Sequence, residues 1–91
     1  MDIVQPTSSG YTIYSKSGCS GCTAAKRALK QLNEDYIEID CDDFLIEDRD
    51  SFIDFIVDLV RSTSRIAISP PIFPFIFYNG KYIGNSIDAF A

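Results

Sequence analysis

The sequence has no histidine, only three cysteines and no long apolar run. A closed structural zinc site needs four ligands, usually cysteine or histidine. This chain has one pair of closely spaced cysteines, so it cannot supply such a site alone. A helix that crosses a bilayer needs about 20 consecutive apolar residues. The most apolar stretch, residues 69–77 ("SPPIFPFIF"), is interrupted by prolines, and we expect no membrane segment.

Basic side chains are also scarce. The chain has 8 lysine and arginine residues against 13 aspartate and glutamate residues, which gives a net charge of −5. Nucleic acids and anionic membranes require a basic surface, so neither is expected as a partner. Residues 1–10 lack the positive and apolar regions of a signal peptide. An odd number of cysteines also fits a disulfide-stapled secreted protein poorly. We therefore expect a cytoplasmic protein.

The chain is long enough for one hydrophobic core, so we expect a single domain over residues 1–91. Residues 11–14 are β-branched and aromatic and predict a strand. From Cys22 onward, apolar residues recur at helical spacing; they are Ala25, Ala28, Leu29 and Leu32. Residues 36–41 alternate as a second strand. The order strand, helix, strand predicts a βαβ unit.

A second helix is predicted over the stretch that contains residues 52–60, with Asp50 or Ser51 as its N-cap. Asn79-Gly80 is the favoured type I′ turn between strands at residues 75–78 and 81–83. A short C-terminal helix follows. We therefore predict an α/β fold: a four-stranded mixed sheet, built from the βαβ unit and the hairpin and flanked by helices.

The cysteine pair lies at the start of the first helix. Cys19 precedes the helix and Cys22 falls in its first turn, on the inward face. Unpaired N–H groups, the helix dipole and the nearby Lys16 all favour a thiolate at Cys19. Such surroundings lower a cysteine pKa from about 8.5 to roughly 3.5–7.5. Cys19 is therefore predicted to be the nucleophile and Cys22 the resolving thiol of thiol–disulfide exchange.

A structural role is the alternative for each of the cysteines. Both members of the pair could be small buried apolar residues, but their position before a helix in a βαβ unit favours chemistry. Cys41 follows the second strand among Asp40, Asp42 and Asp43. Because these acids raise the pKa of a neighbouring thiol, we expect Cys41 to be structural.

Three segments in this order resemble the glutaredoxin family and, more widely, the thioredoxin fold. They are "YSKSGCSGC", "TAAKRALKQLNEDYIEID" and "FPFIFYNGKYIGNSID". The resemblance covers nearly the whole chain. It implies a minimal glutaredoxin-like domain with a shortened C-terminal helix, either complete as a monomer or covered by another subunit.

The resemblance also implies a glutathione site. Pro74 matches the family's cis-proline, with Pro70 and Pro71 as less well placed rivals, and the Phe73 backbone would pair with bound glutathione. Lys16 would bind the glycine carboxylate, and residues Gly84 to Asp88, including Asn85, would hold the γ-glutamyl end. For Asp88 a capping role is an equal alternative. The role of a second carboxylate-binding residue stays open between Arg61 and Arg65.

Some positions depart from the family pattern. Ser20 and Gly21 separate the cysteines where many relatives have Pro-Tyr, and Gly18 replaces a usual aromatic residue. Without the proline we expect a more flexible loop. Asn85 and Ile87 make recognition of the γ-glutamyl end less secure.

Three functions follow. The first is a glutathione-dependent thiol–disulfide oxidoreductase that reduces protein disulfides or glutathionylated proteins. The second is a dimer that holds a [2Fe–2S] cluster, with Cys19 as the protein ligand and Ser20 as the small residue that permits it. The third is a thioredoxin-like electron donor, for example to ribonucleotide reductase, that a reductase reduces.

Overall fold

The computed structural model describes residues 3–66 and 71–90. Along the chain it has β1 (Tyr11–Ser15), α1 (Ser20–Gln31), β2 (Tyr36–Asp40), α2 (Asp42–Thr63), β3 (Phe75–Tyr78), β4 (Lys81–Gly84) and a 3₁₀ helix, η1 (Ile87–Phe90). None of the helices in these described residues is long and apolar enough to cross a membrane.

The four strands form one sheet in the order β2-β1-β3-β4. β1 pairs in parallel with β2 and antiparallel with β3, and β3 pairs antiparallel with β4. This is the predicted mixed sheet of a βαβ unit and a hairpin, and the thioredoxin-like fold class is confirmed. At the hairpin turn both Asn79 and Gly80 have positive φ, 52° and 81°, as a type I′ turn requires.

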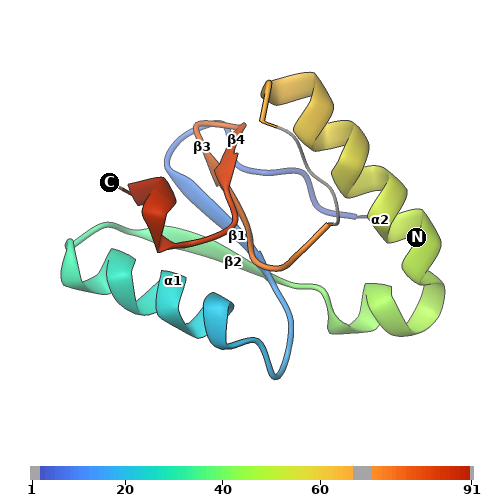
Figure 1. Cartoon of the computed structure of the whole chain (residues 1–91), viewed down its shortest axis with the longest axis horizontal. Coiled ribbons are helices and arrows are strands. Elements are labelled where there is room, and N and C mark those ends of the chain that lie inside the picture. The colour runs from blue at the N-terminus through green and yellow to red at the C-terminus, as the bar shows by residue number, and fades with distance from the viewer. Residues whose placement is uncertain (1–2, 67–70, 91) are drawn as a thin grey trace.

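Helices cover both faces of the sheet (Figure 1). On one face, α1 and η1 pack against a small core formed by Ile13, Ala25, Leu29 and Ile76. On the other face, α2 packs against a larger core that includes Tyr14, Phe52, Ile56, Val60 and Phe77. Ile13 and Tyr14 are consecutive in β1 but belong to different cores, because successive side chains of a strand point to opposite faces of the sheet.

α2 differs from its prediction. It begins at Asp42, directly after β2, and bends at Asp48, whose φ of −158° and ψ of 83° are not helical. Asp48 accepts hydrogen bonds from the N–H of Ser51 at 3.1 Å and from its hydroxyl at 2.7 Å. Asp48 therefore caps the second part of the helix, and the prediction of Asp50 or Ser51 as the cap was wrong.

Candidate active site at the N-terminus of α1

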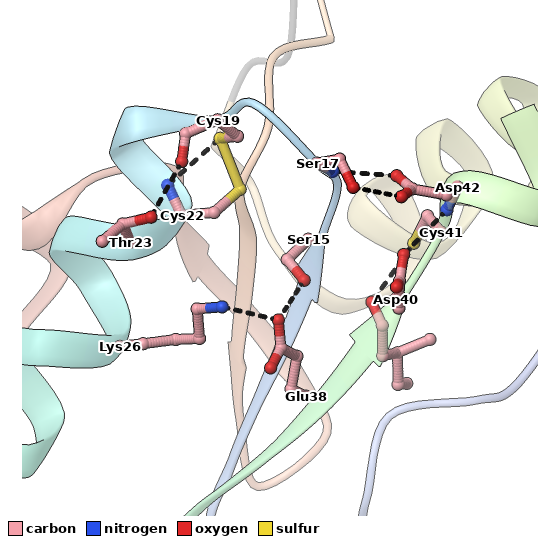
Figure 2. Close-up of polar contacts among 11 residues, drawn as sticks. Ser15, Ser17, Cys19, Cys22, Thr23, Lys26, Glu38, Asp40, Cys41 and Asp42 are labelled. Carbon is pink, nitrogen blue, oxygen red and sulfur yellow. Dashed lines mark hydrogen bonds and ion pairs between the residues drawn. A yellow bond between two sulfur atoms is a disulfide. The ribbon is translucent and has the colours of Figure 1, made fainter.

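Cys19 and Cys22 lie at the end of β1 where the chain turns into α1. Cys19 is the N-cap residue with an extended backbone, φ −105° and ψ 105°, and Cys22 lies in the first turn. Their Cα atoms are 5.2 Å apart and their sulfurs form a disulfide (Figure 2). The Cys19 Sγ also accepts a hydrogen bond from the Cys22 N–H at 3.1 Å. The sulfur of Cys19 therefore takes the place of a capping oxygen.

The two sulfurs differ in access to solvent. The Cys22 residue is 1% exposed and packs on the inward face of α1, whereas Cys19 is half-buried. Thiol–disulfide exchange requires an attacking sulfur to reach its target in line. A partner thiol or disulfide therefore reaches Cys19 and not Cys22.

The helix end presents positive charge to Cys19. The first turn of α1 contains no acidic residue that would offset the helix dipole. The Thr23 N–H donates to the Cys19 carbonyl at 3.2 Å and continues the helical pattern. In the reduced protein, a thiolate at Cys19 would be stabilised both by the hydrogen bond from the Cys22 N–H and by the helix dipole.

A pocket of about 290 Å³ opens beside the pair. Lys16 and both cysteines line it. So do residues of β1, α1 and β2 that include Ser15, Lys26, Glu38 and Asp40. The structure thus brings Lys16 to the same site as Cys19, as predicted from their spacing.

Lys16 also contacts Phe73. Its Nζ lies 5.4 Å from the centre of the Phe73 ring, within range of a cation–π interaction. The Lys16 side chain is otherwise exposed. The contact joins the loop before Cys19 to the segment before β3.

The peptide bond between Phe73 and Pro74 is cis, as predicted, and Pro74 is buried. The rival Pro70 lies outside the described residues. A Cβ atom placed on Gly21 would lie 3.3 Å from Pro74 Cδ, which is a tight contact. Gly21 therefore lets the first turn of α1 lie directly against the cis-proline. Gly21 between the cysteines therefore has a role in packing, which the sequence alone did not predict.

A row of aromatic rings packs against the Phe73 ring. Phe52 stacks on Phe73 with ring centres 5.9 Å apart and on Phe44 with ring centres 5.8 Å apart. Phe75 meets the Phe73 ring edge-on at 4.9 Å. The helical spacing of residues 52–60 predicted the helix that contains Phe52 but did not connect Phe52 to Phe73. Only the tertiary fold brings these rings together.

Asp42 is a second residue that sequence reasoning missed. Its carboxylate accepts hydrogen bonds from the N–H of Ser17, at 2.8 Å, and from the Ser17 hydroxyl. These bonds hold the pKa of Asp42 below its usual value, and Lys16 lowers it further. The segment between β1 and Cys19 is therefore tied to the start of α2.

Gly84, Asn85 and Asp88 follow the hairpin. Gly84 has a φ of 149°, and a Cβ atom there would lie 3.1 Å from the Ala89 Cβ, so a side chain at this position would be strained. Asn85 and Asp88 are exposed. Asp88 lines a separate pocket with Ala28 and Gln31 of α1 and with Leu32, which follows that helix. The structure therefore does not place Asp88 in the pocket that contains Cys19.

Cys41 is fully buried in the larger core. Burial is the main reason why its pKa rises to about 12, and the charge of Asp40 raises it further. The predicted direction of this shift is confirmed, but the prediction named only the acids as its cause. Such a thiol is a poor nucleophile at neutral pH.

The described ranges, 3–66 and 71–90, contain no group of three histidine, cysteine, aspartate or glutamate side chains arranged to bind a metal ion. The cluster alternative stays a prediction.

A mixed sheet with a cysteine pair at the start of its first helix, opposite a cis-proline, defines the class of thioredoxin-fold thiol–disulfide oxidoreductases. Residues 11–83 match the family model described as Glutaredoxin. The chain belongs to the glutaredoxin family.

A solved structure supports the same assignment. The chain is similar to glutaredoxin 1 from Francisella tularensis, solved in complex with cacodylate, with 26% sequence identity and a TM-score of 0.66. The alignment covers 87% of this chain and 84% of that one. No curated protein matches the chain in a sequence search.

Proposed function

We propose that this protein is a glutathione-dependent thiol–disulfide oxidoreductase that reduces protein disulfides and glutathionylated proteins. The observation that carries this proposal is the asymmetry of the cysteine pair. Cys19 is accessible and caps a helix with its sulfur, while Cys22 is buried next to it. This arrangement separates an attacking sulfur from a resolving sulfur.

In the first step the Cys19 thiolate attacks one sulfur of the target disulfide. A bond forms between Cys19 and that sulfur, and the other half leaves as a thiolate that takes a proton from water. If the target is a glutathionylated protein attacked at the glutathione sulfur, the protein leaves as a free thiol. Cys19 then carries glutathione.

Two routes complete the reaction. A second glutathione thiolate attacks the glutathione sulfur on Cys19, which releases oxidised glutathione and restores the Cys19 thiolate. When Cys19 is instead joined to a protein, Cys22 loses its proton, attacks the Cys19 sulfur and expels the protein as a thiol. Two glutathione molecules then reduce the Cys19–Cys22 disulfide, and the first must attack Cys19 because Cys22 is buried.

The proposed glutathione groove runs past Lys16, Phe73 and Pro74. Lys16 would pair with the glycine carboxylate, and the backbone of Phe73 would bind the cysteinyl part. The contact of Lys16 with the Phe73 ring supports this placement, because it brings both groups to one side of Cys19. Gly84, Asn85 and Asp88 would hold the γ-glutamyl end, Asp88 from its position beyond the pocket of Cys19. We further propose that the protein acts as a monomer in the cytoplasm, where reduced glutathione is abundant.

The test is a deglutathionylation assay with Cys19→Ser, Cys22→Ser and, as a matched control, Cys41→Ser. Loss of all turnover in Cys19→Ser with retained turnover in Cys22→Ser is expected, because the glutathione route does not need Cys22. Cys41→Ser should remain active, because the buried Cys41 thiol is a poor nucleophile at neutral pH. Retained activity in Cys19→Ser would overturn the assignment of the nucleophile.

Glutathione dependence is tested separately with the oxidised protein. Its reduction by glutathione is compared with its reduction by NADPH and thioredoxin reductase, and the protein purified without oxygen is inspected for a cluster absorption band. Rapid reduction by glutathione in a colourless protein supports the proposal. Reduction by the reductase alone would favour the electron-donor alternative, and an iron-dependent band would favour the cluster alternative.

A further inference from the structure

The charges of this acidic chain are strongly segregated. Between residues 3 and 33 there is no acidic side chain, and the four charged residues there are Lys16, Lys26, Arg27 and Lys30. Eleven of the 13 acidic residues fall between residues 34 and 58, since the other two are Asp2 and Asp88. The segment with α1 is therefore positive in a protein whose net charge is −5.

The basic residues of α1 line a surface depression next to the cysteine pair. A pocket of about 380 Å³ lies between α1 and β2 and is lined by Thr23, Lys26, Arg27, Lys30, Tyr36 and Glu38. Three of these residues, Thr23, Lys26 and Glu38, also line the pocket beside Cys19. The two pockets are therefore contiguous, and a chain bound at Cys19 can extend into the basic one.

The acid within this depression is already neutralised. The Lys26 Nζ lies 2.7 Å from Glu38 Oε2, and the Ser15 hydroxyl donates to the same oxygen at 2.6 Å (Figure 2). Within the described residues this is the one ion pair, so Arg27 and Lys30 have no carboxylate partner there, and both are exposed. Their charge is available to an incoming acidic group.

We propose that Arg27 and Lys30, next to the Lys26–Glu38 ion pair, form a docking surface for an acidic segment of the protein substrate. This docking proposal rests on the proposed function, because the acidic segment must belong to a protein whose disulfide or mixed disulfide reacts at Cys19. Complementary charge raises the rate of encounter and selects between partners. The surface would therefore favour acidic substrates over basic ones.

The geometry also sets the spacing of the acidic segment. Arg27 and Lys30 lie 8 and 11 residues after Cys19 in sequence, which at 1.5 Å per helical residue is about 12 to 17 Å along α1. An extended peptide spans about 3.3–3.6 Å per residue. Acidic residues should therefore act best when they lie about three to five residues from the reacting cysteine. Glu34 and Asp35 follow the end of α1 after two residues, so the run of basic residues along the chain ends there.

The test uses three synthetic peptides, each with one glutathionylated cysteine. Acidic residues occupy the positions three to five residues away in the first, lysines occupy them in the second, and neutral residues in the third. The measured quantity is kcat/KM for deglutathionylation at low salt, as the ratio of the acidic to the basic peptide within each protein variant. A substitution that alters the chemical step affects the acidic and the basic peptide equally, so it leaves this ratio unchanged.

For the unaltered protein we expect a ratio of about 10, which falls toward one in high salt. In R27E/K30E the ratio should fall below one. In the matched control R49E/K81E, which makes the same change in net charge at exposed sites outside α1, the ratio should stay near that of the unaltered protein.

The same peptides, dye-labelled and with serine in place of cysteine, give a binding readout by fluorescence anisotropy that does not depend on catalysis. A ratio or a binding preference that is unchanged in R27E/K30E, or equally reduced in the control, would overturn the docking proposal. Absence of turnover of even the neutral peptide would instead overturn the proposed function, and the anisotropy measurement would still decide the docking.

Discussion

Asp42 accepts two hydrogen bonds from Ser17, although the two residues are 25 positions apart in the sequence. One comes from the Ser17 N–H and the other from its hydroxyl. The first residue of α2 therefore fixes the loop that carries Lys16 toward Cys19. These two hydrogen bonds tether the active-site loop to the start of α2.

Asp42→Asn should loosen this loop. An amide carries no negative charge and has one acceptor oxygen, so the two hydrogen bonds to Ser17 are weakened, and we expect kcat/KM with a glutathionylated peptide to fall about two- to fivefold. Steady-state kinetics measure the change, with Asp43→Asn, its exposed neighbour, as the control. Equal effects in the two variants would show that charge alone, and not the tether, is responsible.

The ion pair of Lys26 with Glu38 should stabilise the fold over a defined pH range. Its hydrogen bond lowers the pKa of Glu38 from its usual 4.5 and raises the pKa of Lys26 from its usual 10.5. The stability from Glu38 is present above pH 4.5 and is lost as pH falls through the lowered pKa. The stability from Lys26 is present below pH 10.5 and is lost as pH rises through the raised pKa.

Because both side chains are partly exposed, 29% and 37%, solvent screening limits the contribution of the pair to about 0.2–1 kcal/mol. Urea unfolding of Glu38→Gln at pH 7 should show a loss of this size. At pH 3 the difference from the unaltered protein should shrink. A loss of equal size at both pH values would mean that the pair does not stabilise through charge.

Phe52 should be the most sensitive of the aromatic residues that support the site, because it stacks on both Phe44 and Phe73 and is fully buried. Phe52→Ala should lower the free energy of unfolding by about 3–5 kcal/mol. Phe52→Leu should fold and raise the KM for glutathione, since Phe73 loses its stacking partner. Calorimetry and kinetics on the leucine variant separate the two effects, and an unchanged KM would show that Phe73 does not need the stack.

Cys41 should make the folded state less stable at high pH. Its pKa rises from 9.0 to about 12 on folding, so between these values the unfolded chain loses a proton that the folded protein keeps. Stability therefore falls as pH rises above 9, by up to about 1.4 kcal/mol per pH unit from this group. Cys41→Ala removes this dependence, and denaturation at pH 8 and pH 10 measures the difference. Iodoacetamide should modify Cys41 only after unfolding.

The parts of the fold that depend on local signals could be predicted from the sequence. The spacing of Ala25 and Leu29 predicted α1, and Asn79-Gly80 predicted the hairpin, because the turn requires positive φ at both positions. The start of α2 could not be read in this way. Residues 42–50 are mostly acidic and have no clear apolar period, and the bend at Asp48 follows from a side-chain cap that competes with the helix.

The same distinction between local and long-range contacts applies to the candidate site. Cys19, Cys22 and Lys16 lie close in the sequence, so their spacing on a strand and a helix predicted their proximity. The contacts of Gly21 with Pro74 and of Ser17 with Asp42 join residues far apart in the chain. Their existence depends on how α2 and β3 pack, which local pattern does not encode.

The burial of Cys22 restricts the order of events during turnover. Substrate and reductant must both react through the one accessible sulfur, that of Cys19, so they cannot be bound in reacting positions together. Each partner has to leave before the next arrives. Double-reciprocal plots at several glutathione concentrations should therefore give parallel lines, the kinetic pattern of a ping-pong mechanism.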